Sequence, residues 1–354
     1  MEFVKLQMFV PSAPIFSSTV SYNAIKDLKP IEINNDLTLR KSAENTQLLE
    51  SYFAKKIPLI PVRRVSNFST RSDFPSRVLL EMTSRCNLVC TMCPSRKLTR
   101  DKMDISPELF KKCVDELDDK GLDGIWIYNI GESILHPDFE ILLHYTATKK
   151  NLGPVWLSSN GQDLNKTFRT QIIDSKIQFM NLSVNATTKT THSKVSPGAS
   201  WENIQENFKS FLKEKKNTGN RFPISRVQII DQECATHEVD AFLSEYLELA
   251  DLLSVNTLEG FSQNVETNNE YSRARQRGEK RCRRVSRQDL FIFSNGETTF
   301  CDTDFNGVFS LGNVQHDTIA KIWNSQTRNN ILKMNQEGRL GEIDLCSDCL
   351  DFDL

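Results

Sequence analysis

From residue 77 onward, short runs of β-branched and other apolar residues alternate with longer segments in which apolar residues recur every three to four positions. The short runs predict strands and the longer segments predict helices. The six predicted strands cover residues 77–83, 124–130, 154–161, 179–186, 226–231 and 252–258. The predicted helices among them cover residues 106–121, 137–151, 165–175, 201–216 and 237–250.

Repeated strand–helix units predict an α/β fold with parallel strands and right-handed crossovers. Six units are fewer than the eight of a complete barrel of this kind, so we expect a partial (β/α)6 TIM-type barrel. The first predicted helix has clear end signals, with Ser106 as N-cap, Pro107 at the first position and Gly121 at the end. In such sheets the chemistry lies at the carboxyl ends of the strands.

The rest of the chain divides around this core, which we place at residues 76–258. Residues 1–75 are expected to form an N-terminal packing extension, with a helix over residues 42–56. A polar linker at residues 259–280 leads to a small domain over residues 281–354. In that domain the pattern predicts a hairpin that turns at Asn295 and Gly296, and then one amphipathic helix over residues 316–335 that starts near Asp317 or Thr318.

Composition narrows the function classes. The chain has 354 residues, a net charge of −2 and an isoelectric point near 6.3, which argues against general binding to nucleic acid or to an anionic membrane. The sequence holds no run of eighteen apolar residues, so no membrane span is expected. The N-terminal segment is a poor signal peptide. Clustered cysteines in such a chain favour metal sites in a reducing cytoplasm over disulfides.

Three of the nine cysteines form a C-x3-C-x2-C loop directly after the first predicted strand: Cys86, Cys90 and Cys93. A structural zinc site takes four protein ligands, usually as two separated pairs, so it fits this triplet poorly. A cubic iron–sulfur cluster normally takes four cysteines, so three would leave one iron open.

A three-cysteine loop at this place resembles that of the radical S-adenosylmethionine (SAM) superfamily. The resemblance implies a [4Fe–4S] cluster whose open iron is chelated by the amino and carboxylate groups of SAM. It further implies reductive cleavage of SAM to a 5′-deoxyadenosyl radical that abstracts hydrogen from substrate. A flavodoxin or ferredoxin is the electron donor that this resemblance implies.

Other strand ends resemble the SAM-contacting motifs of the same family. The stretch 129–139 resembles the G-G-E-P motif, with Gly131 and Glu132 retained, Ile130 in place of the first glycine and Ser133 in place of the proline. Residues 157–161 resemble the T-N-G turn, and residues 182–192 resemble the stretch that contacts the ribose. The implied cofactor-binding residues are Met92, Gly131, Glu132, Ser159, Asn160, Ser183 and Asn185.

Four further cysteines lie in the C-terminal part: Cys282, Cys301, Cys346 and Cys349. This part resembles the SPASM extension, in its shortened form called Twitch. Full SPASM domains hold two extra clusters, but five residues without a cysteine follow Cys349, so we expect one auxiliary [4Fe–4S] cluster ligated at every iron. An all-cysteine zinc site remains the alternative.

The two remaining cysteines have separate interpretations. Cys113 is expected to be a core thiol beside Phe110, Val114 and Leu117. Cys234 follows the fifth predicted strand, so it is either an ordinary loop thiol or a catalytic donor of a hydrogen atom to a substrate radical.

The resemblance implies an enzyme, and several reactions stay open. The first hypothesis is dehydrogenation of a hydroxyl-bearing carbon of a sugar, cyclitol or amino sugar, with the second cluster as electron acceptor. The alternatives are modification of a ribosomally made peptide, epimerisation with Cys234 as hydrogen donor, and a non-catalytic electron carrier. The substrate is therefore expected to be a small molecule or a peptide.

Overall fold

The computed structural model describes residues 3–8, 16–21, 73–220, 222–246, 249–261, 265, 280–287, 289–347 and 349. The chain forms two compact units. The first, here the cysteine unit, comprises Asn67–Ser158, Asp174–Ile177 and Glu259–Leu354, and the second, the companion unit, comprises Met1–Ser66, Ser159–Ile173 and Gln178–Leu258.

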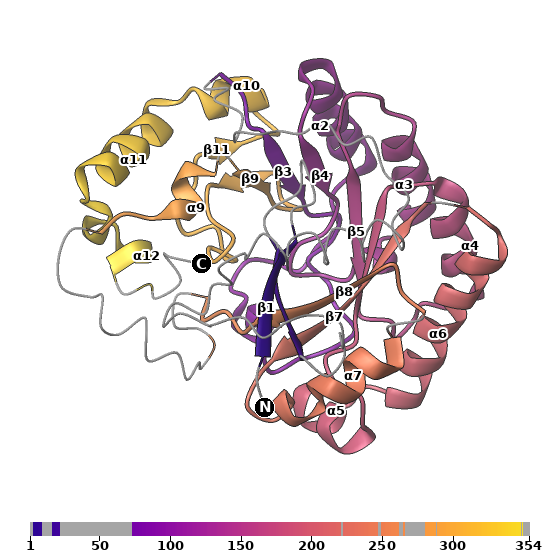
Figure 1. Cartoon of the computed structure of the whole chain (residues 1–354). Coiled ribbons are helices and arrows are strands. Elements are labelled where there is room, and N and C mark those ends of the chain that lie inside the picture. Colours follow the sequence, from indigo (N-terminus) through magenta and orange to yellow (C-terminus); the bar gives the residue numbers. More distant parts are fainter. Residues whose placement is uncertain are drawn as a thin grey trace, which may run out of the picture. The chain divides into compact units, whose positions relative to one another are not determined.

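A mixed sheet forms the centre of the cysteine unit (Figure 1). Its strands are β3 (Arg77–Leu80), β4 (Gly124–Trp126), β5 (Val155–Ser159), β9 (Asp289–Ile292), β10 (Glu297–Thr299) and β11 (Gly312–Asn313). Strand β4 pairs in parallel with both β3 and β5. On its other side β3 pairs in parallel with β9, and β10 then continues antiparallel to both β9 and β11. Strands from the C-terminal part therefore extend the parallel core.

Helices α2 (Pro107–Lys120) and α3 (Phe139–Ala147) follow β3 and β4 in the chain. The Ser106 hydroxyl accepts a hydrogen bond from the Leu109 N–H, and Gly121 ends α2 with a φ of 75°. These contacts confirm the predicted ends of this helix. The indole rings of Trp126 and Trp156 stack at 5.8 Å between neighbouring strands and help to fill the core.

The C-terminal part confirms the predicted hairpin and corrects the predicted helix. Phe293 N–H donates to the Glu297 carbonyl across the turn, where Gly296 has a φ of 82°. The single helix predicted over residues 316–335 was wrong, because the structure has α10 (Ile319–Trp323) and α11 (Gln326–Glu337). The break has a local cause, since the Ser325 hydroxyl accepts from the Arg328 N–H and starts a new helix.

The remaining short elements of the cysteine unit are η2 (Pro94–Lys97), η3 (Ser133–Leu135), α9 (Arg283–Ser286), η5 (Leu340–Glu342) and α12 (Asp344–Ser347).

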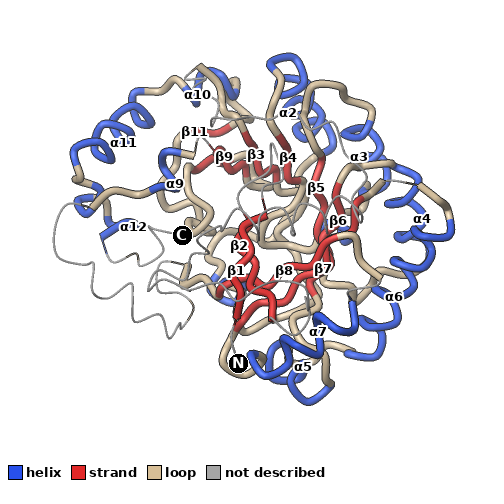
Figure 2. The backbone as a smooth tube through the Cα atoms, in the orientation of Figure 1, coloured by secondary structure: helices blue, strands red, loops and turns tan. Residues whose placement is uncertain are grey.

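Three parallel strands organise the companion unit, and Figure 2 shows them in red. They are β6 (Phe179–Ser183), β7 (Ile224–Asp231) and β8 (Leu252–Thr257). The helical elements of this region are α4 (Lys166–Ser175), α5 (Lys189–Val195), α6 (Trp201–Asn217), η4 (Thr236–Glu238) and α7 (Val239–Tyr246). Antiparallel strands β1 (Phe3–Met8) and β2 (Phe16–Ser21) also belong to this unit, and neither they nor α5 was predicted.

All six predicted core strands are present, and the expected α/β class is confirmed. The helix predicted over residues 42–56 and most of the expected linker lie outside the described residues. In the part of the chain that the structure describes, no helix has the length and apolar character needed to cross a membrane.

Candidate active site

The three-cysteine loop begins at a backbone that is held from two sides. The Ser84 N–H donates to the Met103 carbonyl, and the Met103 N–H donates to the Ser84 hydroxyl. The Thr83 hydroxyl donates to the carboxylate of Asp104 and accepts from the Arg85 N–H. The residues directly before Cys86 therefore have a fixed path, as a preorganised site requires.

Within the loop, the Cys93 N–H donates to the Cys90 carbonyl and closes a turn. The three cysteines are half-buried, whereas Met92 between them is 6% exposed. The pKa of the Cys86 thiol is raised to about 12, mainly by burial and also by the nearby Glu132, Cys90 and Cys93. Thiolates crowded in this way repel one another. Positively charged iron ions bound to them would offset that repulsion.

Gly131 and Glu132 pack directly against this loop. The Glu132 N–H donates to the Arg85 carbonyl at 2.8 Å, and the Glu132 side chain is 3% exposed. A Cβ atom on Gly131 would lie 2.0 Å from the Thr83 carbonyl oxygen, so only glycine allows this close backbone approach. The carboxylate predicted to bind the methionyl ammonium of SAM is thus held beside the cysteine loop.

Ser133, which stands where the family motif has proline, has its own structural role. Its buried hydroxyl donates to the Ile127 carbonyl at 2.9 Å and ties the motif to the chain just after β4. His136 in the same segment accepts at Nδ1 from the Asp138 N–H, so its Nε2–H donates to the Ile105 carbonyl. Side-chain hydrogen bonds therefore fix the path of this segment.

A buried ion pair links the cysteine loop to the C-terminal part within the same unit. Arg100 forms two hydrogen bonds of 2.6 Å with Glu81, whose side chain is fully buried. Glu81 also accepts from the N–H and hydroxyl of Ser294, and Arg100 donates to the Phe305 carbonyl. The strand before the loop, the segment after it and the C-terminal part are therefore held together by one hydrogen-bonded group.

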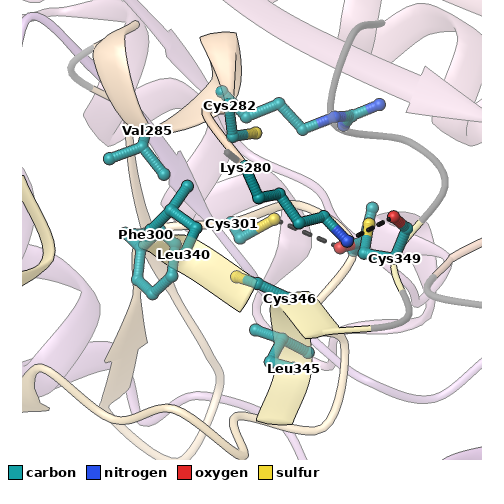
Figure 3. Close-up of a pocket in the computed structure, with 11 residues that line it drawn as sticks. Lys280, Cys282, Val285, Phe300, Cys301, Leu340, Leu345, Cys346 and Cys349 are labelled. Carbon is teal, nitrogen blue, oxygen red and sulfur yellow. Dashed lines mark hydrogen bonds between the residues drawn. The ribbon is translucent and has the colours of Figure 1, made fainter. Parts of the chain in front are cut away.

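The four C-terminal cysteines surround one pocket (Figure 3). The remaining lining is mostly apolar, with Lys280, Arg284 and Thr303 as its polar members; the apolar residues are Val285, Phe300, Leu340 and Leu345. Within the described residues, no three cysteine, histidine or acidic side chains converge as ligands of a single metal ion. Four cysteines around one pocket could ligate an iron–sulfur cluster or a zinc ion.

Hydrogen bonds hold the segments that carry Cys282 and Cys349 at this pocket. Asn335 on α11 accepts from the Cys282 N–H and donates to the Cys282 carbonyl. The Lys280 ammonium donates to the carbonyls of Ser347 and Cys349, each at 2.9 Å. The pKa of the Cys346 thiol is raised to about 12, mainly by burial and also by the nearby Cys282 and Cys349, as in the first cysteine loop.

The other predicted SAM-binding residues belong to the companion unit. The buried Ser159 hydroxyl accepts from the Gly161 N–H, and the Asn160 carbonyl oxygen Oδ1 accepts from the Gln162 N–H. These two contacts form the turn predicted after β5. Both side chains therefore shape the backbone of the turn.

Ser183 and Asn185 lie at the carboxyl end of β6. The Ser183 hydroxyl accepts from the Asn181 amide. Asn185 is 8% exposed and has a φ of 59°, a left-handed conformation that asparagine tolerates better than most residues. Its buried Oδ1 accepts no hydrogen bond from any described residue, so it is available to a hydroxyl donor such as a ribose.

The two isolated cysteines differ in environment. Cys113 is 1% exposed on α2 beside Phe110, Val114 and Leu117, which confirms a core thiol. Cys234 is half-buried in a turn directly after β7, where the Ala235 N–H donates to the Gln232 carbonyl.

Comparison of the sequence with models of known protein families shows which family the chain belongs to. A model described as "Radical SAM superfamily" matches residues 80–225, and one described as "Iron-sulfur cluster-binding domain", SPASM, matches residues 282–350. Together they cover more than half of the chain. The chain is a radical SAM protein with a C-terminal SPASM domain.

Curated relatives align with part of the chain. A "Tungsten-containing aldehyde ferredoxin oxidoreductase cofactor-modifying protein" from Pyrococcus furiosus is 26% identical over 43% of this chain and 42% of its own length. The "Mycofactocin maturase MftC" of Mycobacterium tuberculosis is 30% identical over 36% of this chain and 32% of its own length. The chain therefore spans only about a third to two fifths of these relatives.

Solved structures extend the likeness in fold. BtrN in complex with AdoMet and 2-DOIA matches with a TM-score of 0.53 and 18% identity, over 78% of this chain and 93% of that one. Streptococcus suis SuiB bound to S-adenosylmethionine matches with a TM-score of 0.59 and 15% identity, over 90% of this chain and 79% of that one. The expected α/β core with a SPASM domain is thus confirmed, and a radical SAM domain carries a [4Fe–4S] cluster and binds SAM.

The residues present fit those groups. In the radical SAM domain, the cysteine loop and Glu132 share one hydrogen-bonded scaffold, which suits an iron–sulfur cluster beside a bound ammonium group. In the SPASM domain, four thiols surround one pocket. The expectation that Cys86, Cys90, Cys93, Cys282, Cys301, Cys346 and Cys349 are the ligands stays a prediction.

Sequence reasoning missed several residues around the SPASM pocket. Arg284, Thr303 and Lys280 line it, and Asn335 fixes Cys282 from a helix far along the chain. The only signal for Arg284 was its place two residues after Cys282, in a segment with several other basic residues. Its burial depends on long-range pairing that no local pattern encodes.

Proposed function

We propose that this radical SAM protein dehydrogenates a hydroxyl-bearing carbon of a sugar, cyclitol or amino sugar. In the net reaction the substrate loses one hydrogen atom, one proton and one electron, and its carbinol becomes a carbonyl. SAM, held at a cluster on Cys86, Cys90 and Cys93, would supply the radical chemistry that removes the hydrogen atom. A fully ligated cluster on Cys282, Cys301, Cys346 and Cys349 in the SPASM domain would accept the electron.

The composition of the SPASM pocket carries this proposal. Four thiols surround it, and most of its other lining is apolar. A cluster held by four cysteines has no open iron for a substrate, so its role is electron transfer. An enzyme that needs an electron acceptor beside its radical chemistry performs a net oxidation.

The residues of the radical SAM domain have distinct tasks in this scheme. Cys86, Cys90 and Cys93 would hold the open-iron cluster. Glu132 would bind the methionyl ammonium, and Asn185 would accept from the ribose hydroxyl. Gly131 lets the Glu132 segment approach the cysteine loop.

Two variants test the proposal. The double variant Cys346→Ala, Cys349→Ala should still form 5′-deoxyadenosine from SAM, because the radical SAM domain keeps its own ligands, whereas it should form no ketone from a panel of amino sugars and cyclitols. Cys113→Ala is the matched control, because it removes a buried core thiol, and it should keep both activities. Loss of cysteine metal sites can unfold small domains, so a circular-dichroism melt accompanies the assay.

Full ketone formation by a folded double variant would rule out the SPASM cluster as the electron acceptor. Turnover to a product with the oxidation state of the substrate would instead contradict dehydrogenation. Attention would then turn to Cys234. If this thiol donates a hydrogen atom, the reaction is a redox-neutral epimerisation, and Cys234→Ala would stop product formation while abstraction continued.

A second candidate function is peptide modification. Three of the curated relatives are named mycofactocin maturases, with 28% and 30% identity. The gene neighbourhood separates the candidates, since a short precursor-peptide gene favours this reading and sugar-modifying genes favour dehydrogenation.

A further inference from the structure

A buried guanidinium lies at the SPASM pocket. Arg284 lines the pocket together with all four cysteines, and its side chain is only 2% exposed. It forms an ion pair with Asp302 and a second one with Glu259 at 3.2 Å. A charge so deeply buried is costly unless it is compensated, so its place beside the thiols needs an explanation.

Arg284 belongs to a larger network of ion pairs that is partly buried. Asp302 also accepts from Arg287 at 3.0 Å, Arg287 pairs with Asp289 at 3.1 Å, and Asp289 pairs with Arg77 at 2.7 Å. The network contains as many carboxylates as guanidinium groups when Glu259 is included, so it is balanced without the cysteines. Among its members only Arg284 lines the pocket.

Both signs of charge in the network come near the thiols, because Arg284 lines their pocket and the Asp302 carboxylate accepts from the Cys301 thiol at 3.7 Å. An iron–sulfur cluster on four thiolates is negatively charged, and its reduction adds further negative charge. A fixed cation in the lining of this largely apolar pocket therefore stabilises the reduced form more than the oxidised form. The Thr303 hydroxyl, 3.2 Å from the Cys301 sulfur, acts in the same direction when it donates to that sulfur.

We propose that Arg284 raises the reduction potential of the SPASM cluster and so makes that cluster the electron acceptor of the reaction. The inference rests on the proposed ligation of this cluster by Cys282, Cys301, Cys346 and Cys349. In this proposal Arg284 acts through the positive charge that it holds at the cluster pocket, and it does not contact the substrate. Asp302 has the opposite effect on the potential, since its carboxylate lies 3.7 Å from the Cys301 sulfur.

A purely structural role for Arg284 makes a different prediction. In that case Arg284 only anchors Asp302. Replacement of any buried arginine of the network should then have the same effect on the midpoint potential of the SPASM cluster. Arg77 is the matched comparison, because its side chain is 7% exposed and pairs with Asp289, yet it does not line the pocket.

The test is a redox titration of the reconstituted full chain, followed by electron paramagnetic resonance of the SPASM cluster. Arg284→Met should shift its midpoint potential to lower values, and Asp302→Asn should shift it to higher values. Arg77→Met should lower the melting temperature and leave the potential unchanged. Equal potentials for wild type and Arg284→Met, or shifts of the same sign for Arg284→Met and Asp302→Asn, would overturn the proposal.

A second comparison covers the case in which Arg284→Met fails to retain the cluster. Arg284→Lys keeps the charge and should keep the wild-type potential, while Asp302→Asn still leaves Arg284 paired with Glu259. A lower potential for Asp302→Asn than for Arg284→Lys would overturn the proposal. A wild-type protein without a second redox-active cluster would instead contradict the ligand assignment on which the proposed function depends.

Discussion

Replacement of Gly131 by alanine tests how the radical SAM site is assembled. The new Cβ would lie 2.0 Å from the Thr83 carbonyl oxygen and 2.8 Å from the Arg85 carbonyl oxygen, where ordinary contacts start at 3.4 Å. Both neighbours are backbone atoms, so no side chain can rotate away. The two segments must separate by more than 1 Å, which also breaks the 2.8 Å hydrogen bond from the Glu132 N–H to the Arg85 carbonyl.

The expected cost has two parts. Overpacking costs about 1–3 kcal/mol, and loss of a buried hydrogen bond costs roughly 1 kcal/mol. Gly131→Ala should therefore lower the free energy of unfolding by about 2–4 kcal/mol. A displacement of this size beside the reacting groups should lower the rate of 5′-deoxyadenosine formation by about a hundredfold.

Gly341→Ala is the matched control, because a Cβ at that position has no atom within 4 Å. Its free energy of unfolding should change by less than about 0.5 kcal/mol, and its SAM cleavage should be unchanged. Urea melts and single-turnover assays of both variants measure the two quantities. Wild-type stability and activity in Gly131→Ala would refute the packing argument.

Three further predictions concern the rest of the described structure. Arg100→Met leaves the fully buried Glu81 carboxylate without its ion-pair partner, so urea melts should show a loss of about 3–5 kcal/mol; a loss below about 1 kcal/mol would show that the pair contributes little. Burial lowers the pKa of His192 below its ordinary value of 6.5, so the unfolded chain binds more protons than the folded one and stability falls as the pH drops through 6.5. His192→Gln should flatten that part of the profile, and parallel profiles for variant and wild type would contradict this assignment. Anaerobically reconstituted wild type should bind about eight irons, whereas about four irons with one zinc would show a zinc site in the SPASM domain.

The radical SAM core was predictable because its signals are local. Ser106, Pro107 and Gly121 mark the ends of α2 within one segment, and the alternation of apolar runs located all six core strands. The cysteine spacing and the sequence around Glu132 pointed to the same strand ends. Each of these features lies within a window of a few residues.

Features that depend on long-range pairing were missed. Residues 316–335 have one continuous amphipathic pattern, yet the Ser325 side chain starts a second helix, and the Asn324 amide donates to the Asp73 carbonyl from far along the chain. Helix α5 was missed because its sequence is polar, although Thr188 provides an N-cap for it. The pairing of Arg284 with Asp302 and Glu259 also joins distant segments, so local composition could not reveal it.

The mass and isotopic content of the product test the central claim most directly. Reconstituted, reduced protein is incubated in deuterium oxide with SAM and a panel of amino sugars and cyclitols, and the products are analysed by mass spectrometry. The account predicts a carbonyl product that has lost two hydrogens relative to its substrate, with no deuterium at the reacting carbon. A product with one deuterium at that carbon and the oxidation state of the substrate would contradict it.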